Sequence, residues 1–249
     1  MIGGSGFYEL PGIEIVEEIA TSTPWGVPSS PLVLTRIKGK EVVFLARHGK
    51  GHRYLPHEVN YRANIAALKH IGVREIVAFS AVGSLKEEIK PLDFALPDQL
   101  IDRTRTRPSS FFGNGVAGHV SFADPYCKRL QDLVAGEAAG LGITMHRGET
   151  LVCIEGPSFS SRAESNLYRS WGAGLVNMSS LPEARLAREA ELCYVLVCMV
   201  TDYDCWRSRE EDVAIDEILE NLKRNTENAR NLILSVVERL GGERYCKCS

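Results

Sequence analysis

The sequence predicts an α/β fold in which helices pack on a mostly parallel sheet within one domain. Short apolar runs alternate with stretches of helical periodicity along most of the 249 residues, the pattern typical of α/β folds. The hydrophobic content of 44% is enough for a large core. No internal repeat, low-complexity tract or linker divides the chain, so a single domain spanning residues 1–249 is the simpler prediction.

The expected elements follow from the period of the apolar residues. Strand-length apolar runs occur at 42–46, 75–79, 151–154, 174–178 and 192–200. Helical patterns occur at 60–70, 126–140, 161–171 and 182–191. A longer helix is expected over about 211–240, with an apolar stripe that includes Ile218 and Leu222 and that we interpret as core-facing. A cysteine-containing tail, 241–249, follows it.

Charge and hydropathy exclude several classes of function. The net charge of -3 and the pI near 6.1 give no basic field for nucleic acid or an acidic membrane. No apolar stretch approaches the roughly 20 residues that span a bilayer, and no signal peptide is recognisable. We therefore expect a cytoplasmic protein with no nucleic-acid or membrane partner. The basic and aromatic segment 102–119 is interpreted as a solvated or subunit-facing loop.

Seven cysteines are many for such a chain, but they contain no paired CxxC pattern of a zinc site. The sequence thus predicts no metal. Cys153, Cys193 and Cys198 lie in apolar runs and are expected to be small buried hydrophobes. Cys246 and Cys248 lie in a polar tail that packing does not explain. A redox-active or disulfide-bonded pair and a chance occurrence both stay open for them.

Two carboxylates, Asp202 and Asp204, end the apolar run 192–200 and flank Tyr203. A run of this length predicts a strand that is buried on both faces. Alternate residues of a strand share a face, so the two acids would point the same way. Ligands bind at the carboxyl end of strands in open α/β sheets. Repulsion between two close carboxylates raises at least one pKa and creates a proton donor; a solvated turn is the alternative interpretation.

Other polar groups follow further predicted strands. Gly3-Gly4-Ser5-Gly6 forms a turn whose backbone N–H groups could face an anion, although a dinucleotide-binding fingerprint would need glycine in place of Glu9. Arg47 and His48 follow the strand at 42–46 and could grip phosphate oxygens. Small, hydroxyl or aromatic residues end the other strands: Ser80, Ala81, Phe159, Asn177, Met178 and Ser179. Together these positions predict the site of an α/β enzyme.

These motifs resemble the 5'-methylthioadenosine phosphorylase family of the purine nucleoside phosphorylase superfamily. The resemblance runs from Ile2 to about Trp206. It is carried by Gly3-Gly4-Ser5-Gly6, Leu45-Ala-Arg-His-Gly49, Val59-Asn-Tyr-Arg-Ala-Asn64, Gly83-Ser-Leu85, Asp102-Arg-Thr104, Ile154-Glu-Gly-Pro157, Phe159-Ser-Ser-Arg-Ala-Glu-Ser165, Asn177-Met178 and Thr201-Asp-Tyr-Asp-Cys-Trp206.

The resemblance implies a single α/β domain with a mixed, partly barrel-like sheet, assembled as a homotrimer or homohexamer. It implies phosphorolysis of 5'-methylthioadenosine to adenine and 5-methylthioribose 1-phosphate, a step of purine and methionine salvage, with phosphate as co-substrate and no cofactor. The implied phosphate-binding residues are Ser5, Arg47, His48, Ser80, Ala81 and Ser179. Phe159, Asn177 and Met178 would border base and ribose, a neighbouring subunit's region around His119 would complete the methylthio pocket, and Asp202 and Asp204 would face the purine.

Two other functions stay open on the sequence. One is a broader purine nucleoside phosphorylase that accepts adenosine or 6-oxopurine nucleosides. The other is a non-catalytic nucleotide-binding module, which would rest on the glycine-rich start alone. The two acids favour 6-amino purines, because an amino group donates to a carboxylate whereas a 6-oxo group would face an unpaired acid.

Overall fold

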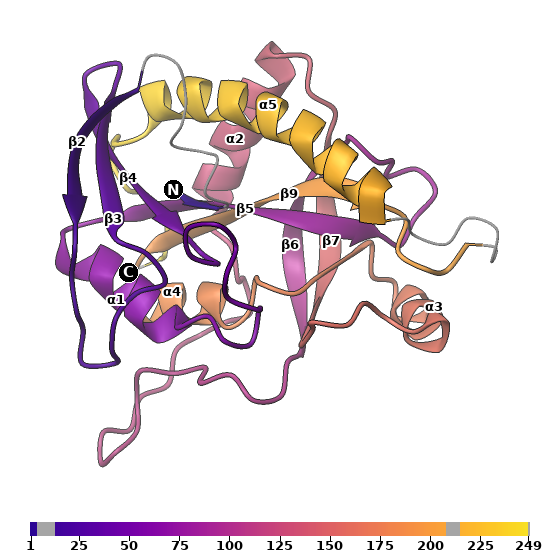
Figure 1. Cartoon of the computed structure of the whole chain (residues 1–249), viewed down its shortest axis with the longest axis horizontal. Helices are drawn as coiled ribbons and strands as arrows, with labels where there is room; N and C mark the ends of the chain where they lie inside the picture. The colour runs from indigo at the N-terminus through magenta and orange to yellow at the C-terminus, as the bar shows by residue number, and fades with distance from the viewer. Residues whose placement is uncertain (4–12, 208–214, 249) are drawn as a thin grey trace.

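A computed structural model describes residues 1–3, 13–207 and 215–248 of the chain (Figure 1). Its strands are β1 (Ile2–Gly3), β2 (Glu14–Ile19), β3 (Leu32–Ile37), β4 (Lys40–Ala46), β5 (Glu75–Ser84), β6 (Phe94–Arg103), β7 (Met145–Ile154), β8 (Leu175–Asn177) and β9 (Cys193–Asp202). Its helices are α1 (Tyr61–His70), α2 (Lys128–Gly140), α3 (Arg162–Ser170), α4 (Glu183–Glu189) and α5 (Ile215–Arg239).

The strands form one mixed sheet that closes partly into a barrel. They follow the order β2-β3-β4-β1-β5-β8-β7-β6-β9, and β5 also pairs with β9. The strands β5, β8, β7, β6 and β9 therefore make a closed ring, while β2, β3, β4 and β1 extend from it as an open sheet. The ring is mixed: β5–β9, β6–β7 and β7–β8 are parallel pairs, whereas β5–β8 and β6–β9 are antiparallel. The expected α/β fold with a mixed, partly barrel-like sheet is confirmed.

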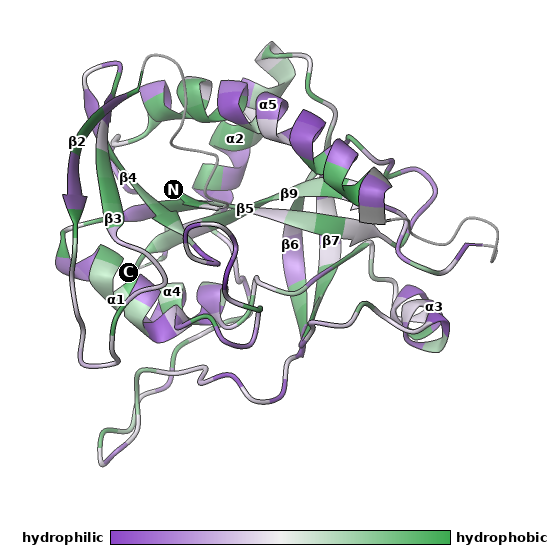
Figure 2. Ribbon diagram, in the orientation of Figure 1, coloured by the Kyte–Doolittle hydropathy of each residue, from purple (hydrophilic) through white to green (hydrophobic). Residues whose placement is uncertain are grey.

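Strand β9 is the centre of the core, as its apolar run predicts. Its side chains alternate between two hydrophobic clusters, with Tyr194 and Leu196 in one and Val195 and Val197 in the other. Helices α1 and α4 cover the first face, and α2 and α5 cover the second (Figure 1). In Figure 2 the sides of these helices that face the sheet are hydrophobic, whereas the exposed edge strand β2 mixes hydrophobic residues with glutamates. Strand β9 is thus buried on both faces, as expected.

Local signals set the starts of two helices. The side chain of Asn60 accepts a hydrogen bond from the backbone of Ala63 and caps α1. Ser161 and Glu164 form a reciprocal capping box at the start of α3. These contacts satisfy backbone N–H groups that the first turn of a helix leaves unpaired.

All five strand runs and all four shorter helices expected from the sequence are present, and the terminal helix is α5. The strands β2, β3 and β6 were not expected. Part of the 102–119 interpretation is also wrong. Arg107 is only 7% exposed rather than solvated, and its guanidinium donates to the carbonyl oxygens of Met178 and Leu181, each at 2.6 Å.

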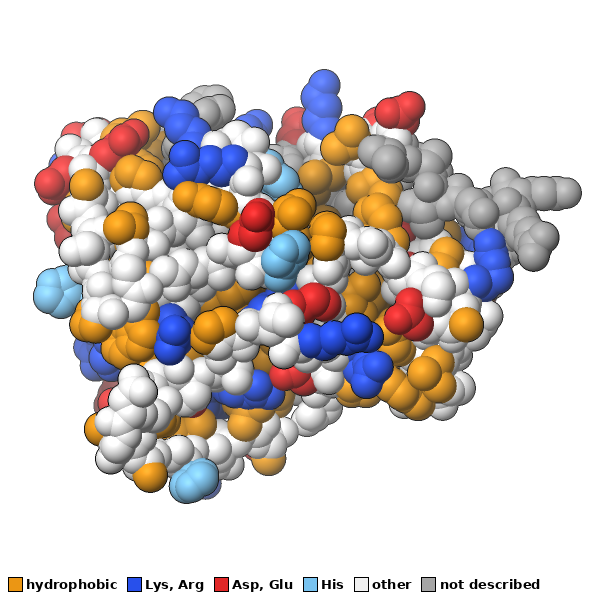
Figure 3. Space-filling view, turned by 60° about the horizontal axis from the view of Figure 1, so that its bottom comes forward, with side chains coloured by type: hydrophobic (Ala, Val, Ile, Leu, Met, Phe, Trp, Pro, Cys, Tyr) orange, Lys and Arg blue, Asp and Glu red, His pale blue; other side chains and the backbone are white. Residues whose placement is uncertain are grey.

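No helix within 1–3, 13–207 and 215–248 has the length and apolar composition of a membrane span. On the face drawn in Figure 3, Lys and Arg side chains are interspersed with Asp and Glu side chains.

Candidate active site

A cavity of about 530 Å³ opens where several strands end. Residues that directly follow or end β4, β5, β7, β8 and β9 line it, together with one side of α5. Ten of the twelve site residues expected from the sequence line this cavity: Arg47, His48, Ser80, Ala81, Phe159, Asn177, Met178, Ser179, Asp202 and Asp204. Segments from the whole length of the chain therefore meet at one place.

Two expected residues are not placed there. Ser5 lies outside the described residues. His119 is exposed on the loop between β6 and α2 and does not line the cavity of the single chain. A role for His119 would therefore require a second copy of the chain, as the resemblance implies.

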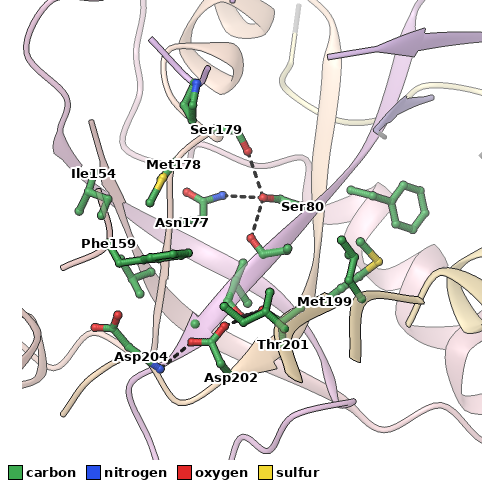
Figure 4. A pocket seen from close by; sticks show the side chains of 18 of the residues that line it. Ser80, Ile154, Phe159, Asn177, Met178, Ser179, Met199, Thr201, Asp202 and Asp204 are labelled. Atoms are coloured by element: carbon green, nitrogen blue, oxygen red, sulfur yellow. Dashed lines mark hydrogen bonds between the residues drawn. The ribbon is translucent and has the colours of Figure 1, made fainter. Parts of the chain in front are cut away.

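Hydroxyl and amide groups occupy one end of the cavity (Figure 4). The Ser80 and Ser179 hydroxyls lie 3.0 Å apart, and the Asn177 amide donates to Ser80 at 3.1 Å. Ser180 donates in turn to the amide oxygen of Asn177 at 3.0 Å, which fixes the direction in which Asn177 points. The serines thus present orientable donors to a ligand at the ends of β5 and β8.

Arg47 brings positive charge to the same end, but a buried carboxylate holds it. Its Nε and Nη2 donate to both oxygens of Glu183 at 2.7 and 2.8 Å, and its Nη1 donates to the Phe79 carbonyl at 2.8 Å. Tyr194 donates to the same carboxylate at 2.8 Å. Arg47 is 2% exposed and Glu183 is fully buried, so the fork geometry is fixed before any ligand arrives. Glu183 was not expected from the sequence, because it lies 136 residues away from Arg47.

His48 lies beside Arg47 as a neutral imidazole. Its Nδ1 lies 2.9 Å from the Tyr54 carbonyl oxygen, which can only accept, so Nδ1 carries the proton and Nε2 has a free lone pair. Burial, followed by repulsion from the Arg47 guanidinium, lowers the pKa of His48 to about 4. The ring stacks on His52 with centroids 4.5 Å apart. His48 is therefore suited to accept a hydrogen bond from a ligand hydroxyl.

The acid pair lies at the other end of the cavity (Figure 4). Strand β9 ends at Asp202, and Asp204 then adopts a left-handed backbone conformation with φ of 50°. This turn brings the backbone N–H of Asp204 within 2.8 Å of a carboxylate oxygen of Asp202. Both acids line the same cavity, as expected. However, it is the turn after the strand that places Asp204 there, and not the alternation of side chains along the strand, so that part of the prediction is wrong.

The two carboxyl groups differ in environment. The Thr201 hydroxyl lies 2.7 Å from Asp202 Oδ2 and 3.2 Å from the Val82 carbonyl oxygen. It can donate to an ionised Asp202, or accept from a protonated one and donate to Val82. Asp204 is 5% exposed, and burial is the largest cause of its raised pKa. The raised pKa thus results mainly from desolvation and not from a second carboxylate, which was the cause expected from the sequence.

The side walls are apolar. Phe159 and Met178 lie on one side of the cavity in Figure 4, opposite Met199. Ile218 and Leu222 of α5 also line it. Both were expected in the core-facing stripe, because helical periodicity does not distinguish a core position from a cavity wall. Asn221 and Asn225, which donate to the Thr201 and Val200 carbonyls at 2.9 and 2.8 Å, fix α5 against β9.

Comparisons with known proteins agree with this geometry. The family model described as "Phosphorylase superfamily" matches residues 1–238. The chain is 52% identical to an S-methyl-5'-thioadenosine phosphorylase of Koribacter versatilis, covering 100% of this chain and 85% of that protein. It is 54% identical to one of Schizosaccharomyces pombe, covering 96% and 81%.

Solved structures give the same result. A methylthioadenosine phosphorylase from an antarctic soil metagenomic library superposes with a TM-score of 0.95 at 46% identity, covering 99% of this chain and 88% of that one. The methylthioadenosine phosphorylase of Schistosoma mansoni in complex with adenine gives 0.93 at 37% identity, covering 98% and 92%. By sequence and by fold, the chain belongs to the phosphorylase superfamily.

Proposed function

We propose that this protein is a pentosyltransferase that cleaves 5'-methylthioadenosine with phosphate, releasing adenine and 5-methylthioribose 1-phosphate. One observation carries the proposal: a single cavity has a cationic, hydroxyl-rich end and a two-carboxyl end, separated by apolar walls. Phosphate and a 6-amino purine need these two ends respectively. Relatives that are 50% identical or more and match nearly the whole chain bear this enzyme's name.

The phosphate end would bind the attacking group. Arg47 and the hydroxyls of Ser80 and Ser179 would hold the phosphate oxygens, and the lone pair on His48 Nε2 would accept from a protonated one. A phosphate oxygen then forms a bond to C1' of the ribose while the bond from C1' to the purine nitrogen breaks. The positive charge that develops on the ribose is stabilised by the phosphate dianion.

The acid end would receive the leaving base. The electron pair of the broken bond moves into the purine and accumulates at N7, where Asp202 would donate a proton or a hydrogen bond. Thr201 accommodates Asp202 in either protonation state. Asp204 would pair with the 6-amino edge or with the proton of Asp202. We propose that neither a metal nor an organic cofactor takes part in this step.

Phosphate-dependent release of adenine tests the proposal. We expect release from methylthioadenosine to exceed release from adenosine, because Ile218 and Leu222 are apolar, and to exceed release of hypoxanthine from inosine. A solved relative at 37% identity is an adenosine/methylthioadenosine phosphorylase of Schistosoma mansoni, so adenosine is the comparison to measure first. Base release that ignores phosphate would indicate a hydrolase and refute the proposal.

Two variants of Asp202 separate the possible roles of its carboxyl group. Asp202→Ala should lower kcat at least about tenfold, the usual size of an acid–base contribution. Asp202→Asn keeps a hydrogen-bond donor but cannot transfer a proton. Equal losses in both variants indicate proton transfer, whereas a smaller loss in Asn indicates hydrogen bonding. An unchanged kcat in a folded Ala variant would remove Asp202 from the mechanism.

We further propose that the protein assembles as a homotrimer or homohexamer that acts in purine and methionine salvage. Exposed apolar side chains support the assembly. Phe112, Val116 and Val120 lie on the loop that carries His119, and Phe159, at the cavity, is 60% exposed in the single chain. Light scattering on the purified protein measures the mass directly, and a monomer at assay concentration would contradict this assignment.

A further inference from the structure

Four of the seven cysteines meet at the end of β9 that lies away from the cavity. The Sγ atoms of Cys127, Cys193, Cys246 and Cys248 all lie within 4.8 Å of one another. They come from three segments: the start of α2, the first residue of β9 and the C-terminal tail. Sequence spacing concealed the group, because only two of the four are close along the chain.

The tail is packed, contrary to the sequence interpretation that packing does not explain it. Cys248 is 6% exposed and belongs to the same hydrophobic cluster as Cys127 and Cys193. Arg188 donates to the Lys247 carbonyl at 3.0 Å and Arg244 donates to the Glu191 carbonyl at 3.3 Å. The tail therefore returns to the body of the domain at a fixed place.

The other two thiols lie on rigid elements. The Cys127 N–H donates to the Tyr194 carbonyl at 2.8 Å, and the Cys193 N–H donates to the Arg74 carbonyl at 3.1 Å. None of the four forms a disulfide in the structure. Two sulfurs on the scaffold thus face two sulfurs on the tail.

We propose that these four cysteines bind one zinc ion as a structural tetrathiolate site. In a tetrahedral site with Zn–S distances of about 2.3 Å, the sulfurs are about 3.8 Å apart. The four sulfurs lie within 4.8 Å of one another, so none needs to approach another by more than about 1 Å. The Cys193 and Cys246 sulfurs, 3.2 Å apart, would separate slightly. Four thiolates are the ligand set of closed structural zinc sites.

Positive charge lies beside the four sulfurs. The Arg129 guanidinium contacts the sulfurs of Cys193 and Cys246 and forms an ion pair with Glu75. A zinc tetrathiolate carries a net charge of about -2, which a buried guanidinium partly balances. Cys127 also lies at the N-terminus of α2, where partial positive charge favours thiolates.

The ion would stabilise the fold and not act in catalysis. Cys193 and Asp202 are the two ends of β9, nine residue steps apart along an extended strand, a distance of roughly 30 Å. The site instead ties the tail to the starts of α2 and β9. On binding, the four thiols release their protons and take up one metal ion. The proposed zinc site does not depend on which reaction takes place at the cavity.

Metal content and thiol state test the proposal together. The full chain, without a histidine tag, is purified with a phosphine reductant. Its zinc content is measured by inductively coupled plasma mass spectrometry. We expect about one zinc per chain in the wild type and almost none in the double variant Cys246→Ser/Cys248→Ser. Cys205→Ser is the matched control, because its half-buried thiol lies outside the cluster, and it should retain the zinc.

Cobalt gives a readout on the unmodified chain. Replacing zinc by Co²⁺ should produce the intense sulfur-to-metal absorption of a tetrahedral thiolate site, and the double variant should lack it. The wild type should also unfold at a lower temperature after chelation, while the double variant should not respond. Failure of the reduced wild type to bind Zn²⁺ or Co²⁺, or intact masses showing disulfides within the cluster despite the reductant, would overturn the proposal.

Discussion

Replacing Glu183 by Gln should destabilise the protein strongly, because it leaves the Arg47 charge buried without a partner. The pair is 3% and 0% exposed at the side chains, and the carboxylate accepts two bonds from Arg47 and one from Tyr194. Removing one member of such a buried pair costs about 3–5 kcal/mol. For a domain of this length each kcal/mol lowers Tm by roughly 2–4 °C. We therefore expect a drop of about 10 °C.

Guanidinium unfolding measured beside the wild type checks this value. The matched control is Glu14→Gln, which breaks the exposed pair with Arg36 and should change the free energy of unfolding by less than about 1 kcal/mol. A Glu183→Gln variant as stable as the control would refute the reasoning that Arg47 needs this carboxylate.

Phosphate provides a second test of the same pair. The unbalanced Arg47 in Glu183→Gln should favour an anion, so saturating phosphate should raise the Tm of the variant more than that of the wild type. Sulfate of equal ionic strength serves as a comparison for anion size and charge. Equal phosphate shifts in both proteins would show that Arg47 does not face the bound anion.

Three further predictions concern single positions at the cavity. Burial raises the pKa of Asp204, so the wild type loses stability as pH rises through that pKa. In denaturant titrations above about pH 4, the free energy of unfolding of Asp204→Asn should therefore rise relative to that of the wild type. Equal pH dependence in the two proteins would contradict this. The pKa of His48 falls to about 4, so the unfolded chain binds the proton first below about pH 6.5 and stability drops toward pH 4. His48→Asn, which can still donate to Tyr54, should flatten that loss, and an unchanged slope would count against it. In Gly83→Ala the new Cβ would lie 3.1 Å from an Asp202 oxygen, so kcat/KM should fall at least about tenfold. The control is Gly136→Ala on α2, where the new Cβ has no neighbour within 4 Å, and this variant should keep full activity.

The elements that the sequence predicts well are those whose signal is local. Strand β9 is an unbroken apolar run, and the capping box of Ser161 and Glu164 marks the start of α3. Strand β2 gives no such signal, since its residues are nearly all exposed at the sheet edge. Strand β6 contains Pro97 and two register irregularities, so neither composition nor alternation marks it as a strand. Both are held by pairing with other strands, β2 with β3 and β6 with β7 and β9.

The candidate site divides in the same way. Residues that follow predicted strands, such as Arg47, Ser80 and Asp202, were found because the carboxyl ends of strands converge in α/β sheets. Glu183 holds Arg47 from 136 residues away, and Arg107 holds the backbone of Met178 from 71 residues away, so no local signal in the sequence points to either contact.

The four-cysteine cluster shows the limit of spacing as evidence. A search for CxxC pairs assumes that one turn supplies two ligands, which holds where a metal organises a short segment. Here a strand, a helix and a packed tail place the thiols, so the fold itself brings the sulfurs of Cys127 and Cys193 beside those of the tail. A metal site built on a preformed scaffold needs no ligand motif, so the absence of a motif from a sequence is no evidence against a metal site.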